Sequence, residues 1–117
     1  MDIEIVREYC LNKKGVTESF PFGPDTLVFK VGTKVFLLSG LDRFPFNFNV
    51  KTKPEWSEDL RAKYAQIYGA FHMNKKHWNT VECEGIKPEL IYKLIDQSYD
   101  LVLNSLTKKE KELILNS

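Results

Sequence analysis

The stretch Phe44-Pro45-Phe46-Asn47-Phe48-Asn49-Val50-Lys51 decides the fold class of this chain. Its phenylalanines and valine alternate with proline, asparagine and lysine, and a period of two residues predicts a β-strand with one apolar and one polar face. Such a strand is typical of an antiparallel sheet that helices cover on one side and water wets on the other. Because proline lacks an amide hydrogen, Pro45 predicts that this strand starts at a sheet edge or carries a bulge near its beginning.

The segments around this strand predict a mixed set of elements. Gly32-Thr33 is a two-residue connection with glycine first, as a type II′ hairpin prefers, so strands are predicted over residues 26–31 and 34–38. Asp2 and Thr107 are the predicted N-caps of the first and last helices. The further predictions are helices over residues 3–13, 55–66, 88–106 and 108–115, one or two strands over residues 70–72 and 78–83, and an ordered loop over residues 17–24.

This order of elements predicts a single α+β domain over residues 1–117, with a four- to five-stranded antiparallel sheet and helices packed mainly on one face. Ser98 lies within the apolar stripe of the long helix, where a small side chain lets the helix approach the sheet closely. Phe20 and Phe22 are expected to tuck under the sheet. The predicted common core contains Phe44, Phe46, Phe48, Leu94, Ile95 and Val102.

Composition narrows the functional classes. The 17 Lys and Arg nearly cancel the 16 Asp and Glu, leaving a formal charge of +1, whereas a dedicated nucleic-acid binder usually carries a larger basic excess. The start of the sequence has no signal-peptide pattern, and no apolar stretch reaches the length of a membrane span, so a cytoplasmic location without membrane contact is expected. Cys10 and Cys83 are expected to be reduced, buried and structural.

No residue pattern points to catalysis, a cofactor or a metal. His72 and His77 are five residues apart, which suits no helical or strand face, and no cysteine or carboxylate stands close by in sequence to complete a ligand set. No serine has a nucleophile-elbow context, neither cysteine has a neighbouring histidine, and the glycines are scattered singly. The expectation is a non-enzymatic protein with structural histidines.

Basic residues at predicted turns form one candidate site. Winged modules hold phosphates with lysines and arginines at hairpin tips and with an aromatic side chain that stacks on a base. The alternative is that lysine is simply common in turns because turns are exposed to solvent. The candidates for nucleic-acid contact are Lys34, Arg43, Lys51, Lys53, Lys75, Lys76 and Trp78.

A polar pocket is the second candidate site. Asn47, Asn49 and Lys51 share the polar face of the strand quoted above, and Arg61, His72, Asn74 and Trp78 are expected to border it. Such a pocket suits a small anionic molecule or the acidic tail of a partner protein. An ordinary wet sheet face is the alternative.

Several motifs together resemble the MmcQ/YjbR family of small bacterial proteins. They are Glu18-Ser19-Phe20-Pro21-Phe22-Gly23, Phe29-Lys30-Val31-Gly32, Leu60-Arg61, His72-Met73-Asn74-Lys75-Lys76-His77-Trp78 and Gln97-Ser98-Tyr99. The resemblance covers nearly the whole chain and implies a CyaY-like α+β domain. That family is described as DNA-binding with a double-wing arrangement, so the resemblance implies DNA as a partner. A monomer is favoured.

Overall fold

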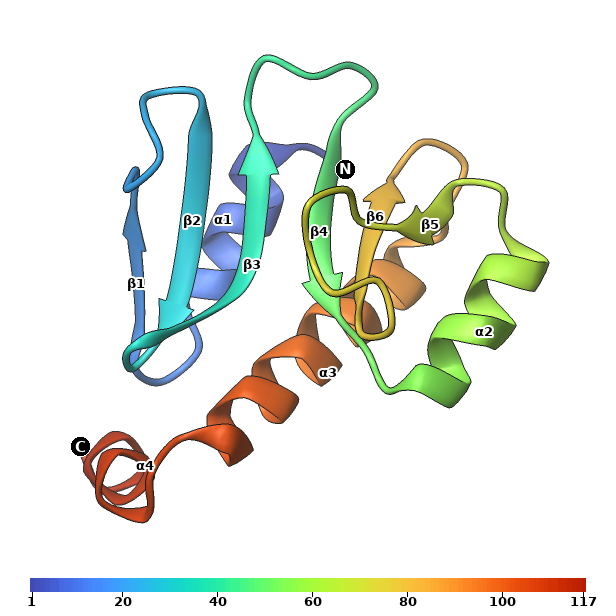
Figure 1. The fold of residues 1–117 in the computed structure, drawn as a ribbon. Helices are drawn as coiled ribbons and strands as arrows, with labels where there is room; N and C mark the ends of the chain where they lie inside the picture. The colour runs from blue at the N-terminus through green and yellow to red at the C-terminus, as the bar shows by residue number, and fades with distance from the viewer.

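The computed structural model describes residues 1–117 as an α+β domain built on one open antiparallel sheet (Figure 1). The sheet has six strands in the order β1-β2-β3-β4-β6-β5. The elements in chain order are α1 (Ile3–Leu11), β1 (Val16–Ser19), β2 (Thr26–Val31), β3 (Lys34–Gly40), β4 (Asn47–Lys51), α2 (Pro54–Lys63), β5 (Ile67–Gly69), β6 (Trp78–Glu82), α3 (Pro88–Ser105) and α4 (Lys108–Leu115).

The helices begin where the sequence predicts. Asp2 accepts a hydrogen bond from the amide of Ile5 at 3.0 Å, and Thr107 accepts one from the amide of Glu110 at 3.2 Å. Pro54 and Pro88 open α2 and α3, where the missing amide hydrogen of proline removes no helical bond. Helix α2 ends at Lys63 and α1 at Leu11, so both are shorter than predicted.

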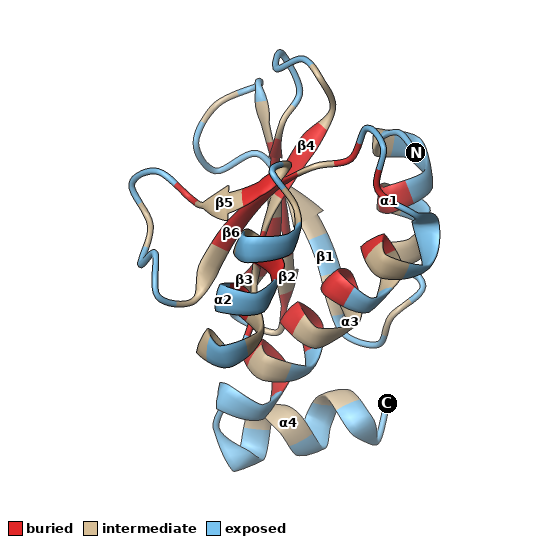
Figure 2. Cartoon of the chain, turned by 90° about the vertical axis from the view of Figure 1, so that its right-hand side faces the viewer, coloured by how far each residue is buried: buried red, intermediate tan, exposed pale blue.

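The core lies between the sheet and α1 and α3 (Figure 2). Phe48, Leu94, Ile95 and Val102 are all buried in it, as predicted. The hydroxyl of Ser98 is fully buried, donates to the carbonyl of Phe36 and accepts from the amide of Lys51 at 2.8 Å. The small residue therefore both lets α3 approach and bonds two strands.

Few residue pairs connect strands β3 and β4 in the sheet. Their register pairs are Leu37 with Val50 and Leu38 with Asn49, and Ser98 bonds backbone groups of both strands beyond these pairs. We call this junction the β3–β4 seam. It divides the sheet into one half formed by β1, β2 and β3 and another formed by β4, β6 and β5.

Two predictions about the first half of the chain were wrong. The predicted loop over residues 17–24 overlaps strand β1, which starts at Val16 and pairs with β2, so the sheet has six strands. Phe20 and Phe22 do not tuck under the sheet, because they follow β1 in a loop where 48% and 71% of their surfaces stay exposed. A four-residue strand without alternation gives no period-two signal.

The beginning of β4 also differs from the prediction. The strand starts at Asn47 and lies inside the sheet rather than at an edge. Pro45 cannot donate to a sheet ladder, so pairing starts only after it, and Phe44 stays in the loop, 94% exposed. Phe46 is half-buried, with its ring 6.2 Å from that of Phe48.

Two strands follow α2, as predicted, but the first begins earlier in the chain than predicted. The strand expected at residues 70–72 lies at Ile67–Gly69, and the next is Trp78–Glu82. Between them, residues 70–77 form a loop, which we call the 70s loop. No helix in the structure combines the length and apolar character needed to span a membrane.

Candidate functional site

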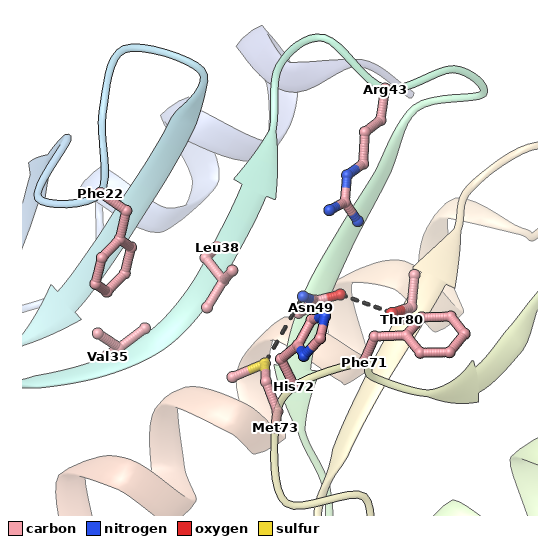
Figure 3. A pocket seen from close by; sticks show the side chains of 9 residues that line it. All are labelled: Phe22, Val35, Leu38, Arg43, Asn49, Phe71, His72, Met73 and Thr80. Carbon is pink, nitrogen blue, oxygen red and sulfur yellow. Dashed lines mark hydrogen bonds between the residues drawn. The ribbon is translucent and has the colours of Figure 1, made fainter.

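A pocket of about 540 Å³ lies on the face of the sheet opposite the core (Figure 3). Strands β3, β4 and β6 form its floor, and three loops form its walls, so it crosses the β3–β4 seam. The lining residues are Phe22, Val35, Leu38, Arg43, Asn49, Phe71, His72, Met73 and Thr80. This face of the sheet is therefore not an open wet surface, because the loops hollow it into a pocket.

A bulge in β3 supplies the apolar part of the floor. Phe29 pairs with Leu37 and Lys30 with Val35, so Phe36 is the extra residue. Residues three apart in a regular strand point to opposite faces, but the extra residue brings Val35 and Leu38 to the same face. Phe36 and Leu37 are both fully buried.

The polar part of the floor is an amide held in one orientation. Thr80 donates its hydroxyl to Oδ1 of Asn49 at 2.8 Å, and the amide nitrogen of Asn49 lies 3.7 Å from the sulfur of Met73. Asn49 and Thr80 occupy paired positions on β4 and β6, so both side chains face the pocket. Their hydrogen-bonding groups are thus directed at neighbours within the site.

The 70s loop forms one wall of the pocket. Asn74 closes its turn: its carbonyl accepts from the amides of His77 at 3.1 Å and Trp78 at 2.9 Å, and its side chain accepts from the amide of Lys76 at 3.0 Å. His72 has a φ of 61°, a left-handed conformation that a histidine rarely adopts. This backbone brings Phe71, His72 and Met73 to the rim.

Arg43 comes to the pocket from the opposite end of the sheet. Its side chain lies over Gly40, where any Cβ would come within 3.1 Å of the arginine stem, so glycine leaves room for it. Figure 3 shows the guanidinium directed toward Asn49. No carboxylate or carbonyl in the structure accepts a hydrogen bond from it. The nearby carboxylate of Glu82 accepts instead from Tyr68 at 2.7 Å, and this bond raises the pKa of the Tyr68 phenol.

Arg61 does not border the pocket, contrary to the prediction. It lies on the helix side of the sheet, where Nε donates to Oδ1 of Asn79 at 2.7 Å and Nη2 donates to the carbonyls of Lys75 at 2.5 Å and Trp78 at 3.2 Å. Asn79 is fully buried and also donates to Thr52 and Ser57. Arg61 therefore ties α2 to the base of the 70s loop.

Only two of the residues predicted to form a polar pocket line the cavity. Asn49 and His72 line the cavity, whereas Asn47 donates to the carbonyl of Pro45 and Asn74 serves the loop turn. No sequence pattern predicted the apolar lining from Phe22, Phe71 and Met73. The period-two pattern places Asn49 on this face, but the fold of the flanking loops carries no such signal.

The basic residues do not form one continuous surface. Lys51 lies opposite Trp78 in the sheet, and the amide of Thr52 bonds the carbonyl of His77, so Lys51 and Lys53 lie on a segment beside that of Lys75 and Lys76. Lys34 turns toward α3, where it donates to the carbonyl of Ser105 at 3.2 Å. Arg43 precedes β4 in the chain, so it lies beyond the other end of that strand.

The cysteine thiols are buried away from this site. Burial raises the pKa of Cys10 and of Cys83 to about 12, so neither is a ready nucleophile. Both were predicted to be buried, and both are.

Comparisons with known proteins give one consistent answer. The YjbR family model matches residues 11–101. The chain is 37% identical to the uncharacterized protein YbdF of Escherichia coli O157:H7, over 95% of this chain and 92% of that protein. It is 31% identical to the uncharacterized protein YjbR of Escherichia coli K12, over 98% of each chain.

Solved structures of similar proteins have the same fold as this chain. A crystal structure from Deinococcus radiodurans, with a domain of the DUF419 family, superposes with a TM-score of 0.89 and 36% identity, over 97% of this chain and 87% of that one. A second, from Pseudomonas syringae, has a TM-score of 0.74 and 27% identity, over 87% of this chain and 99% of that one.

Proposed function

We propose that this chain, which belongs to the YjbR family, is a non-enzymatic module that binds a small molecule carrying an anionic group in the pocket on the face of its sheet opposite the core. The observation that carries this proposal is the guanidinium of Arg43, which faces a partly apolar pocket and bonds no acceptor of its own chain.

The chemistry of the pocket supports binding of an anion. A guanidinium presents several N–H donors in a planar fork that matches the two oxygens of a carboxylate or those of a phosphate. Elsewhere in this chain the guanidinium groups are occupied, Arg7 by Glu18 and Arg61 by Asn79. Small-molecule sites are typically concave and mostly apolar, with a few polar groups that fix orientation, and the lining has this composition.

The lining supports binding more than catalysis. His72 and Arg43 are its ionisable side chains, and the hydroxyl of Thr80 is committed to Asn49. General acid–base or nucleophilic chemistry needs a base oriented against a nucleophile, and this lining holds no such pair.

Methionine methyl NMR provides a sharp test, because the chain has two methionines at separate places. Met73 lines the pocket, whereas Met1 lines a different groove beside Phe44 and Pro45. With 13C-methyl methionine, titration with 8-anilinonaphthalene-1-sulfonate should shift the Met73 signal saturably and leave that of Met1 in place. Arg43→Gln should weaken this binding, and Arg7→Gln is the matched control. Equal shifts at both methionines, or none at Met73, would refute the proposal.

DNA binding is the second candidate function. The observation that favours it is the pair of adjacent segments that carry Lys51, Lys53, Lys75 and Lys76 at one end of the sheet, with Trp78 beside them. Neutralising both Lys75 and Lys76 should reduce the slope of log affinity against log salt by about 0.9 for each phosphate that the protein no longer neutralises.

Fluorescence anisotropy across a salt series measures that slope. Lys108→Gln/Lys109→Gln on α4 is the control with equal charge change. Trp78→Ala should weaken binding only to single-stranded or unpaired substrate if a base stacks there. A parent protein that binds no DNA at low salt, or an unchanged slope in the double variant, would remove this candidate and leave the pocket proposal untouched.

A further inference from the structure

The donors of the pocket limit how many oxygens an anion can place there. Thr80 donates to the side-chain oxygen of Asn49, and one of the two amide hydrogens of Asn49 is directed at the sulfur of Met73, which leaves one amide hydrogen of Asn49 as a donor. Arg43 supplies the one guanidinium of the lining and His72 a further donor, and the ammonium of Lys75 lies 5.1 Å from the ring centre of Phe71. Many phosphate sites also use the N-terminus of a helix, and this lining contains no helix residue. The donors therefore match the two oxygens of a carboxylate.

The surrounding charge also favours a single negative charge. Glu82 lies on the same face of the sheet, paired with Asn47, and its carboxylate is held there by Tyr68. Glu82 follows the lining residue Thr80 by two positions on β6, so its carboxylate lies on the same face of the sheet as the proposed anion position. Like charges repel in such a partly enclosed site, and a dianion is repelled more strongly than a monoanion.

The apolar lining indicates a flat ring. Phe22 and Phe71 are 71% and 68% exposed, and they come from loops on opposite sides of the pocket (Figure 3). Val35, Leu38 and the thioether of Met73 complete the apolar surface between them. Aromatic side chains prefer offset or edge contacts with other rings, and a thioether adds a favourable contact with a ring. A planar apolar ligand can therefore pack against this apolar surface.

We propose that the ligand of this pocket is an aromatic monocarboxylate, with its carboxylate on the guanidinium of Arg43 and its ring held between Phe22 and Phe71 against Met73. This inference rests on the proposed function and specifies its ligand class.

A matched set of probes tests the class. The probes are 2-naphthoate, 2-naphthyl phosphate, 2-naphthalenemethanol and the flexible carboxylate octanoate, titrated against the full chain while the methyl signals of Met73 and Met1 are followed. Naphthoate should bind about 10- to 100-fold more tightly than naphthalenemethanol, as the loss of a charge-assisted hydrogen bond implies. It should also bind more tightly than the phosphate and octanoate.

Variants assign the selectivity to residues. Arg43→Gln should remove the preference for naphthoate over naphthalenemethanol while the alcohol still binds, and Arg43→Lys should restore only part of it, because lysine keeps the charge without the fork. Phe71→Leu should weaken naphthoate more than octanoate. Lys34→Gln, outside the pocket, is the control and should change neither affinity.

The outcomes distinguish a wrong ligand class from a wrong assignment of the pocket as a binding site. Equal or tighter binding of the phosphate overturns the carboxylate assignment, and equal binding of the alcohol overturns the role of Arg43. Equal binding of octanoate overturns the aromatic assignment. In each of these cases the shift at Met73 still supports a ligand pocket, whereas no shift with any probe overturns the proposed function as well.

Discussion

Replacing Arg61 with methionine tests how the candidate site is held in place. The change removes three hydrogen bonds, of which the one to Asn79 at 2.7 Å matters most. The carbonyl of Lys75 can bond water instead, because Lys75 is exposed, and that of Trp78 keeps the amide of Ala70 at 3.0 Å. Asn79 is fully buried, and its Oδ1 bonds no other donor, so it loses its partner entirely.

The expected loss follows from that one buried acceptor. A hydrogen bond to a charged group contributes about 1.5–3 kcal/mol, and a buried acceptor left without a partner costs a similar amount. We therefore expect Arg61→Met to lower the free energy of unfolding by about 1.5–3 kcal/mol. For a chain of this length, 1 kcal/mol corresponds to about 4 °C in Tm, so the melting temperature should fall by about 6–12 °C.

Urea unfolding, followed by tryptophan fluorescence and by circular dichroism, measures the effect. Arg7→Met is the matched control, because it breaks a partly exposed ion pair with Glu18 whose contribution should be at most about 1 kcal/mol. Arg61→Lys should recover part of the loss. A double-mutant cycle with Asn79→Ala should show a coupling of roughly 0.5–3 kcal/mol. An Arg61→Met variant no less stable than Arg7→Met, or zero coupling to Asn79, would refute the reasoning.

Two further predictions concern the core and the thiols. Leu94→Ala removes a fully buried side chain and should lower the free energy of unfolding in urea by about 2–5 kcal/mol. Leu113 is 66% exposed on α4, so Leu113→Ala should change it by no more than about 0.5 kcal/mol. Equal losses in the two variants would contradict the assigned core. Burial raises the pKa of Cys10 and Cys83 from an ordinary 9.0 to about 12, so the unfolded chain releases these protons first and stability should fall as pH rises from about 9 toward 12. The double variant Cys10→Ala/Cys83→Ala should lose stability less steeply over that range, and parallel curves of urea midpoint against pH would refute the assignment.

The sequence predicted the fold wherever a periodic pattern had to bury one face. The alternation along β4 predicted an antiparallel sheet, and the apolar stripe around Leu94 predicted the helix that covers it. The predictions failed at Phe44, where the alternation of apolar and polar residues extends beyond the paired residues of β4. They also failed in β1, which is too short to show a period. Backbone pairing, rather than side-chain pattern, sets the ends of strands.

The candidate site was less predictable than the fold. Lys75 and Lys76 were predicted to lie in a turn, and they do, while alternation predicted the face of the sheet on which Asn49 lies. The bulge at Phe36 and the path of the loop that carries Phe22 depend on contacts between distant segments, so local patterns do not reveal them. Arg61 shows the same limit, because its partners Asn79 and Lys75 follow it by 18 and 14 residues.

The β3–β4 seam has a mechanical consequence for anything that binds in the pocket. With two register pairs, the seam resists torsion less than the longer ladders on either side of it. Val35 and Leu38 lie on one side of it, and Asn49 and Thr80 on the other. A molecule bound across the seam therefore restricts the relative twisting of the two halves of the sheet. The conformational entropy that both halves lose offsets part of the binding free energy. Amide hydrogen exchange would then slow in β2 and in β6 together, although β2 contributes no residue to the pocket lining.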